Sequence, residues 1–371
     1  MMLFPRITIG AIAFLLLIII STTRLLPPHD DIISVRLRPL PNNAELKRIG
    51  PRAMQSLRPS EQLATMQPLI VIGDLHGDLQ AALCALRLGG IIGMDQEHWL
   101  PGLTSVVVQL GDQIDRGDDD RAVLELFARL EEEAHAEGGE AISLIGDHEI
   151  LNCQLAFSYV KPAAFGSFPL NTEAVDAQRA IHRLPAHMVA NKNKRFGPGL
   201  WQGRGASFSV NGSMRVMLSK RNLVHRHGST LVVHAGLLEA VISNNNHSLM
   251  RAITSWADFE HYSDELQSWL RGERQNLPEW LEHPESMIWT RRYGVDEPTD
   301  KDCEALHKLL RMLECKRMVV GHTVQAAGIS SACEGSVWRI DVGLSSSYPA
   351  GRHGRSEVLL VHQDRVQVMS S

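Results

Sequence analysis

Apolar and polar positions alternate in blocks that predict strands separated by helices. Three continuous apolar runs, at 68–73, 104–111 and 141–146, are typical of strands covered on both faces. The stretch 78–91 has apolar residues at helical spacing, and a second helix is expected over 120–137. Strands that alternate with helices in this way indicate βαβ units and a largely parallel sheet.

Further strand-like runs follow a segment, residues 156–204, in which this pattern is lost and which we interpret as an insertion or cap. The later runs are 229–236, 315–322, 336–343, 357–362 and 365–369. The last three suggest an antiparallel second sheet, and helical stretches lie near 246–274 and 301–314. Residues 68–371 are therefore expected to form one α/β domain.

The N-terminus has a different pattern. Residues 7–23 form an apolar run without a charge, near the shortest length that spans a bilayer. A cleaved signal peptide has a shorter apolar core of about 7–15 residues, and a buried soluble helix is rarely apolar on all sides. We therefore favour residues 1–24 as a single anchor in a membrane of the secretory pathway or of another organelle. The orientation and the alternative of a signal segment stay open. Residues 25–67, rich in proline and arginine, are expected to form a stalk.

Composition limits the function classes. The chain has 371 residues, of which 44% are hydrophobic and 21% charged, an ordinary globular balance. The net charge of -5 argues against a nucleic-acid partner that relies on a basic surface. The five cysteines include no C-x-x-C pair, so we interpret them as scattered reduced or buried thiols.

Polar side chains stand at the ends of the expected strands, where the ligand sites of α/β sheets collect. The first three strands are followed by GDLHGD, GDQIDRGD and GDHE, and two later strands end in HAG and GHT. The candidate site residues in these motifs are Asp74, His76, Asp112, Asp115, Arg116, Asp147, His148, His234 and His322. A glycine stands beside the key residue each time, which permits a close approach of backbone to ligand.

The candidate metal ligands offer only oxygen and imidazole nitrogen, which suits manganese, iron or zinc; we favour manganese. Two ligand sets that share one aspartate can hold two divalent ions. They are Asp74, His76 and Asp112 for one ion, and Asp112, Asp147, His234 and His322 for the other. Two ions about 3.5–4 Å apart would clamp a phosphoryl group and generate hydroxide at neutral pH.

In this order, GDLHG, GDQIDRG, GDHE, HAG and GHT resemble the motifs of PPP-type metallophosphatases of the calcineurin-like metallophosphoesterase superfamily. The stretches VVGHTVQ and MIWTRRYG look most like the Shewanella-like protein phosphatase branch. The resemblance implies a four-layer α/β/β/α sandwich, in which a central β-sandwich is flanked by helices and a dinuclear site lies at the strand ends.

The resemblance also implies a role for each residue. It assigns the two ligand sets to two metals, and it makes His148 the general acid that protonates the leaving oxygen. Asp115 would orient His148, and Arg116 and Arg291 would bind the substrate phosphate. Hydroxide held between the metals would attack phosphorus in line. The expected enzyme is a phosphomonoesterase, and the resemblance to the Shewanella-like branch favours a phosphoprotein as its substrate.

One position departs from the family pattern. The family motif is GNHE and this chain has GDHE, so Asp147 replaces a neutral amide. The carboxylate keeps an oxygen for the second metal but adds a negative charge. We expect tighter retention of metal and a more alkaline pH optimum.

Two other functions remain open at this point. A diadenosine-tetraphosphate-type hydrolase of related sequence could use the same residues. A membrane-tethered protein could bind phosphate without hydrolysing it.

Overall fold

The computed structural model describes residues 67–238, 253–295, 297–352 and 354–371. The expected anchor at 1–24 lies outside these residues, as does all but the last residue of the expected stalk. In the described part of the chain, no helix has both the length and the apolar character needed to cross a membrane.

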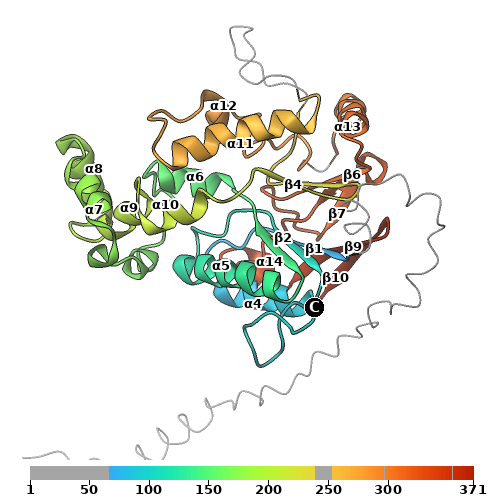
Figure 1. Ribbon diagram of the computed structural model, residues 1–371, viewed down its shortest axis with the longest axis horizontal. Coiled ribbons are helices and arrows are strands. Elements are labelled where there is room, and N and C mark those ends of the chain that lie inside the picture. The colour runs from blue at the N-terminus through green and yellow to red at the C-terminus, as the bar shows by residue number, and fades with distance from the viewer. Residues whose placement is uncertain (1–66, 239–252, 296, 353) are drawn as a thin grey trace, which may run out of the picture. The chain divides into compact units, whose positions relative to one another are not determined.

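The first sheet has five strands in the order β10-β9-β1-β2-β3 (Figure 1). The strands are β1 (Leu69–Ile72), β2 (Val106–Gln109), β3 (Glu140–Ser143), β9 (Glu357–His362) and β10 (Arg365–Ser370). β1, β2 and β3 run parallel, as the alternation of strands and helices predicts. They are joined through α4 (Leu79–Leu88) and α5 (Asp120–Ala136).

The second sheet also has five strands, in the order β4-β5-β6-β8-β7. The strands are β4 (Val224–His227), β5 (Thr230–Val233), β6 (Arg317–Val320), β7 (Ser330–Ala332) and β8 (Val337–Arg339). The prediction that the last three strand-like runs form an antiparallel second sheet is wrong. β8 pairs in parallel with β6, whereas β9 and β10 extend the first sheet beside β1. Short apolar runs predict strands but do not specify their partners.

Apolar clusters separate four layers. Val71 and Val108 of the first sheet meet Val232 and Val319 of the second sheet in the space between the sheets. The other face of the first sheet packs against α4 and α5. The other face of the second sheet packs against α11 (Trp256–Leu270) and α13 (Asp300–Met312). This arrangement is the α/β/β/α sandwich that the resemblance implies.

Residues 156–204, where the alternation of strand-like and helix-like runs is lost, are mostly helical. The elements of this segment, with the helices on either side, are α6 (Asp147–Cys153), η2 (Ala163–Ser167), η3 (Leu170–Thr172), α7 (Val175–His182), α8 (Ala186–Phe196), α9 (Gln202–Phe208) and α10 (Ser213–Leu218). The segment has a small apolar core of its own around Phe157, Phe165 and Trp201. No residue of α8 is fully buried.

The remaining elements include one covalent link. They are α12 (Glu279–Glu282), η4 (Cys333–Gly335) and α14 (Pro349–Arg352). Cys303 in α13 forms a disulfide with Cys333, so the expectation of thiols holds only for the other three cysteines. The two partners are 30 residues apart and share no local motif, because the fold alone brings them together. α13 confirms the helix expected at 301–314, and α11 lies within the one expected at 246–274, whose residues 246–252 are not described.

Candidate active site

The candidate residues lie in the turns that follow the parallel strands of both sheets. They are Asp74 and His76 after β1, Asp112, Asp115 and Arg116 after β2, Asp147 and His148 at the start of α6 after β3, His234 after β5, and His322 after β6. Five of them have a positive φ, which is uncommon for residues other than glycine: His76, Asp112, Asp115, Arg116 and His322. Such backbone costs about 1–3 kcal/mol per residue and persists where the surrounding structure holds it, most often at functional sites.

Four buried side chains, which we call the ligand cluster, bring together the expected second ligand set: Asp112, Asp147, His234 and His322. Their potential ligand atoms all lie within 4.8 Å of one another. Asp147 Oδ1 lies 3.1 Å from His234 Nε2 and 2.9 Å from His322 Nδ1. His234 Nε2 also lies 3.6 Å from Asp112 Oδ1.

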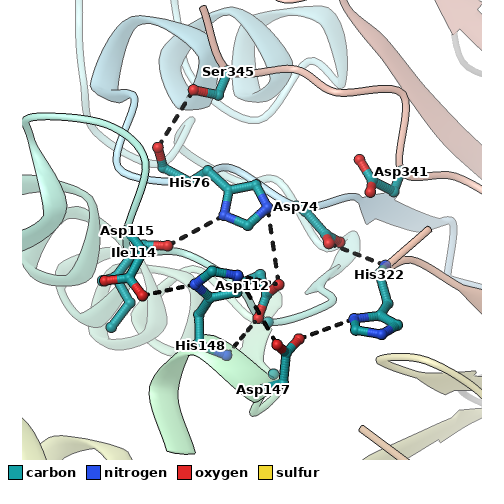
Figure 2. A network of polar contacts seen from close by, with 12 residues as sticks. Asp74, His76, Asp112, Ile114, Asp115, Asp147, His148, His322, Asp341 and Ser345 are labelled. Carbon is teal, nitrogen blue, oxygen red and sulfur yellow. Dashed lines mark hydrogen bonds and ion pairs between the residues drawn. The ribbon is translucent and has the colours of Figure 1, made fainter. Parts of the chain in front are cut away.

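The expected first ligand set is only partly assembled. A second group of potential metal ligands consists of His76, Asp112 and His148, and does not include Asp74. Within this group, His76 Nε2 lies 3.9 Å from Asp112 Oδ2. Asp74 Oδ2 accepts a hydrogen bond from the His322 backbone N–H at 3.0 Å (Figure 2). The other oxygen of Asp74 is buried and has no hydrogen-bond partner.

The hydrogen bonds of the three expected histidine ligands suit metal binding. His234 Nδ1 donates to the Leu110 carbonyl oxygen at 2.9 Å, and His322 Nε2 donates to the Trp289 carbonyl oxygen at 3.1 Å. His76 Nδ1 lies 3.3 Å from a backbone carbonyl oxygen in the same way. A backbone carbonyl on one ring nitrogen selects the tautomer that leaves the other nitrogen free to bind a metal, a usual feature of metal-ligating histidines.

The electrostatics of the cluster also fit a cation site. Burial, with Asp341 nearby, raises the pKa of Asp74 well above its usual value, and burial beside Asp147 raises the pKa of Asp112 to about 8. Burial alone would raise the pKa of Asp147, but hydrogen bonds from the histidines of the cluster hold it well below its usual value. Buried carboxylates in such numbers are stabilised by bound cations. The residues present therefore fit a site for divalent metal ions.

His148 is held by a second set of buried groups beside the ligand cluster. His148 Nδ1 donates to Asp115 Oδ2 at 2.7 Å, and Asn152 Nδ2 donates to Asp115 Oδ1 at 2.9 Å. Burial opposes protonation of His148, but the carboxylates of Asp112, Asp115 and Asp147 raise its pKa to about 10. Divalent ions on Asp112 and Asp147 would cancel part of that field. His148 therefore has the position and the hydrogen bonding of a proton donor.

Glu149 joins the two turns that carry these residues. Its carboxylate accepts hydrogen bonds from the backbone N–H groups of Asp112 and Gln113 at 2.9 Å and of Gly146 at 2.8 Å. Hydrogen bonds to an ionised carboxylate are among the strong ones in proteins. Glu149 is thus a brace that sets the distance between the β2 and β3 turns.

The two candidate phosphate-binding arginines lie on the rim. The Arg116 guanidinium lies 4.7 Å from the ring centre of Tyr159 and 5.6 Å from that of Tyr348. Arg291 is exposed, and its Nη1 donates to the His322 carbonyl oxygen at 3.0 Å. Arg291 also lines a surface cavity of about 640 Å³. Both charges act on histidines of the site: after burial, Arg116 contributes to the lowered pKa of His76, and Arg291 contributes to the lowered pKa of His322.

Sequence reasoning missed three buried residues of the site. Asp341 follows β8, as the other candidates follow their strands, and lies near Asp74 in Figure 2. The strand-end pattern could have found it, but no histidine or second acid marks its motif. Asn152 and Arg204 hold Asp115 from α6 and α9, and no sequence signal connects them with the β2 turn.

Comparisons with known proteins agree with this geometry. The family model described as calcineurin-like phosphoesterase matches residues 67–326. The chain belongs to this family. Shewanella-like protein phosphatase 2 of Arabidopsis thaliana is 29% identical over 320 residues, which cover 82% of this phosphoesterase and 77% of that protein. Shewanella-like protein phosphatase 1 of Plasmodium berghei is 25% identical, over 75% of this chain and 67% of that protein.

Solved structures share the fold of this phosphoesterase. The cold-active protein-tyrosine phosphatase of a psychrophilic Shewanella species superimposes with a TM-score of 0.55 at 19% identity, over 82% of this chain and 77% of that chain. The resemblance inferred from the motifs is therefore confirmed at the level of family and fold. This phosphoesterase is a hydrolase of phosphate esters with a site suited to divalent metals.

Proposed function

We propose that the protein is a metal-dependent phosphomonoesterase that acts on phosphoproteins and uses His148 as proton donor. One observation carries the proposal: the donor and the ligand cluster face each other. His148 Nε2 lies 3.9 Å from Asp112 Oδ2 and 4.0 Å from Asp147 Oδ2. A leaving oxygen of a phosphate bound at the cluster would therefore lie within reach of that nitrogen.

The residues of the chain divide the work of this reaction. The residues that would hold two divalent ions, with manganese favoured, are Asp74, His76, Asp112, Asp147, His234 and His322. Such ions supply positive charge for the phosphoryl oxygens and lower the pKa of water. Asp115 holds Nδ1 of His148, so that Nε2 is the nitrogen that gives the proton. Arg116 and Arg291 would orient the phosphate through their donor forks.

The substrate class is inferred from the relatives. Those described above are named as protein phosphatases, which favours a phosphoprotein over a dinucleotide. Turnover of phosphoserine, phosphothreonine and phosphotyrosine peptides should be measured beside that of diadenosine tetraphosphate. We expect at least one phosphopeptide to be the better substrate, and a clear preference for the dinucleotide would replace this proposal with the dinucleotide hydrolase.

The decisive experiment is an assay with added manganese and phenyl phosphate, an ester whose leaving oxygen needs a proton. We expect His148→Asn to lower kcat about 10²–10⁴-fold, the range for a lost general acid, while bound metal stays the same. The matched control is His227→Asn, because His227 is also buried but lies in β4 and contacts the Gln67 carbonyl oxygen instead of the site. Bound metal without any turnover by the wild type would favour a phosphate-binding protein.

A further inference from the structure

Arg204 lies in α9, at the end of the segment that sequence reasoning treated as an insertion, and is fully buried. Its guanidinium has three polar partners. Nε donates to Asn152 Oδ1 at 2.8 Å, and Nη2 donates to Asp115 Oδ1 at 3.0 Å. Nη1 lies 2.6 Å from Asp120 Oδ2, a close charge contact whose angle is not that of a hydrogen bond.

All three partners of Arg204 also contact the proton donor or its carboxylate. Asp115 holds His148 Nδ1 with its second oxygen, and Asp120 Oδ1 accepts the Asp115 backbone N–H at 2.9 Å. Asn152 donates both to Asp115 Oδ1 and to the His148 carbonyl oxygen at 2.9 Å. We call His148, Asp115, Asn152 and Arg204 the donor network. Arg204 Nη2 and the Asn152 amide both donate to Asp115 Oδ1, which limits the orientations that the Asp115 carboxylate can offer to the imidazole.

The surroundings of Arg204 exclude water. The rings of Phe168 and Phe208 have their centres 4.8 Å and 5.2 Å from its guanidinium carbon, and Phe157 lies 5.9 Å away. A buried ion pair adds little net stability compared with well-packed apolar groups. The charge of Arg204 is therefore better explained by what it holds in place than by stability alone.

Arg215, in the neighbouring helix α10, offers a comparison. It is also buried, and its guanidinium stacks over Trp269 at 4.3 Å. Within the described part of the chain, its hydrogen bonds go only to the backbone carbonyl oxygens of Cys153, Trp269 and Leu270. Arg215 thus has the burial and aromatic packing of Arg204 without any contact to the donor network.

We propose that Arg204 is a positioning residue that holds Asp115, and through it His148, in the orientation from which His148 Nε2 protonates the leaving oxygen. This inference rests on the proposed phosphomonoesterase function. It assigns to the helical segment after α6 a part in the reaction.

The test uses two esters that differ in their need for a proton. p-Nitrophenolate is a weak base and leaves with little help, whereas the phenolate of phenyl phosphate is a stronger base and needs protonation. In the full-length protein with manganese, we expect Arg204→Lys to lower kcat for phenyl phosphate about 10–100-fold, as for other supporting residues. It should lower kcat for p-nitrophenyl phosphate much less and leave both KM values unchanged.

Two further variants frame the result. Asp115→Asn should show the same selective loss, and Arg215→Lys should keep the wild-type ratio of the two kcat values. A purely structural role would lower both kcat values of Arg204→Lys by the same factor, and that result would overturn the inference. Wild-type protein that hydrolyses neither ester would overturn the proposed function, and this inference with it.

A folding defect would not hide the answer. If Arg204→Lys does not fold, the paired variant Arg204→Met with Asp120→Asn removes one buried charge of each sign. Its circular dichroism spectrum and melting curve establish that it is folded. The selective loss on phenyl phosphate is expected there too, and an unchanged ratio of the two kcat values would again contradict the role of Arg204.

Discussion

The ligand cluster and the donor network lie side by side, but their buried charges are balanced in different ways. Among the described residues, the ion pairs of Asp112 and Asp147 are all with histidines, and neither contacts a lysine or arginine. In the donor network, Asp115 is paired with the fixed cation of Arg204. The fold therefore leaves one charge deficit for a metal to fill and fills the other with its own side chain.

This difference teaches what each part of the pocket is for. A site that must take up ions needs surplus negative charge and free ligand atoms, at the expense of stability in the metal-free state. A site that must hold one imidazole in one orientation needs its partners fully satisfied before substrate arrives. Substitutions that replace an aspartate by asparagine in the two places should therefore have opposite effects on the stability of the metal-free protein.

The largest effect should come from Asp112→Asn. Asp112 is the one residue that belongs to both groups of potential metal ligands in the described chain. Its loss should lower kcat by about 10³-fold or more, since metal ions supply several kcal/mol of transition-state stabilisation. Metal analysis should show fewer bound ions per chain. Asp364→Asn, at an exposed ion pair with Lys316, is the control, and full activity of Asp112→Asn would contradict the assignment of the cluster.

The second prediction compares stability in the presence of EDTA. Asp115→Asn should lower the free energy of unfolding by about 1.5–3 kcal/mol, because it removes the charge from the acceptor of buried hydrogen bonds from His148, Asn152 and Arg204. Asp112→Asn should raise it, because at neutral pH the wild-type carboxyl must take up a proton on folding, whereas the amide is neutral in both states. Urea titrations of the two variants and the wild type measure this. Shifts of the same sign would remove the distinction between the two parts of the pocket.

The third prediction concerns the pH dependence of the metal-free protein. Burial raises the pKa of Asp112 from its ordinary 3.8 to about 8. The folded protein therefore binds this proton more tightly, so the contribution of Asp112 to stability is full below pH of about 4 and is lost as the pH rises toward 8. We expect the melting temperature in EDTA to fall across this window and Asp112→Asn to flatten the curve. Identical slopes of melting temperature against pH in the wild type and in Asp112→Asn would show that other groups dominate the pH dependence of stability.

The same comparison explains what could be predicted from the sequence. The residues of the ligand cluster stand at strand ends, and the carboxyl ends of parallel strands meet at one edge of a sheet. Local pattern therefore located Asp112, Asp147, His234 and His322 without knowledge of the fold. The parallel part of the first sheet followed from the same reasoning. The second sheet was assigned wrongly because β8 and β9 have similar apolar runs but different partners.

Only half of the donor network could be predicted from the sequence. Asp115 and His148 belong to strand-end motifs, but Arg204 is 89 residues from Asp115 in a segment without periodicity. Its neighbours are aromatic residues at irregular spacing, so nothing local marks a buried arginine there. Cys303 and Cys333 were missed for the same reason. Contacts made by tertiary packing alone leave no periodic trace.

The fourth prediction tests how the two parts are held together. Glu149→Gln removes the charge that accepts three backbone N–H groups from the β2 and β3 turns. We expect metal affinity to fall about 10–100-fold, the usual cost of losing a residue that orients metal ligands. The control is Glu173→Gln, a buried glutamate with a similar set of partners around Ser207 and Ser213. Equal metal affinity in both variants would show that the turns keep their spacing without Glu149.

The smallest effect should come from Asp147→Asn. The amide keeps a carbonyl oxygen where Asp147 Oδ1 meets His234 and His322, so the change removes charge and little else. Metal should dissociate faster, but by a smaller factor than the roughly 10–100-fold expected when a residue that supports the ligands is lost. The pH–rate profile should move to lower pH. Metal-release kinetics and kcat from pH 5 to 10 measure both effects, and an unchanged profile would contradict the charge argument. Loss of one negative charge is mild here because the bound ions remain balanced by Asp112, whereas the same loss at Asp115 weakens the buried hydrogen bonds from Arg204 and His148.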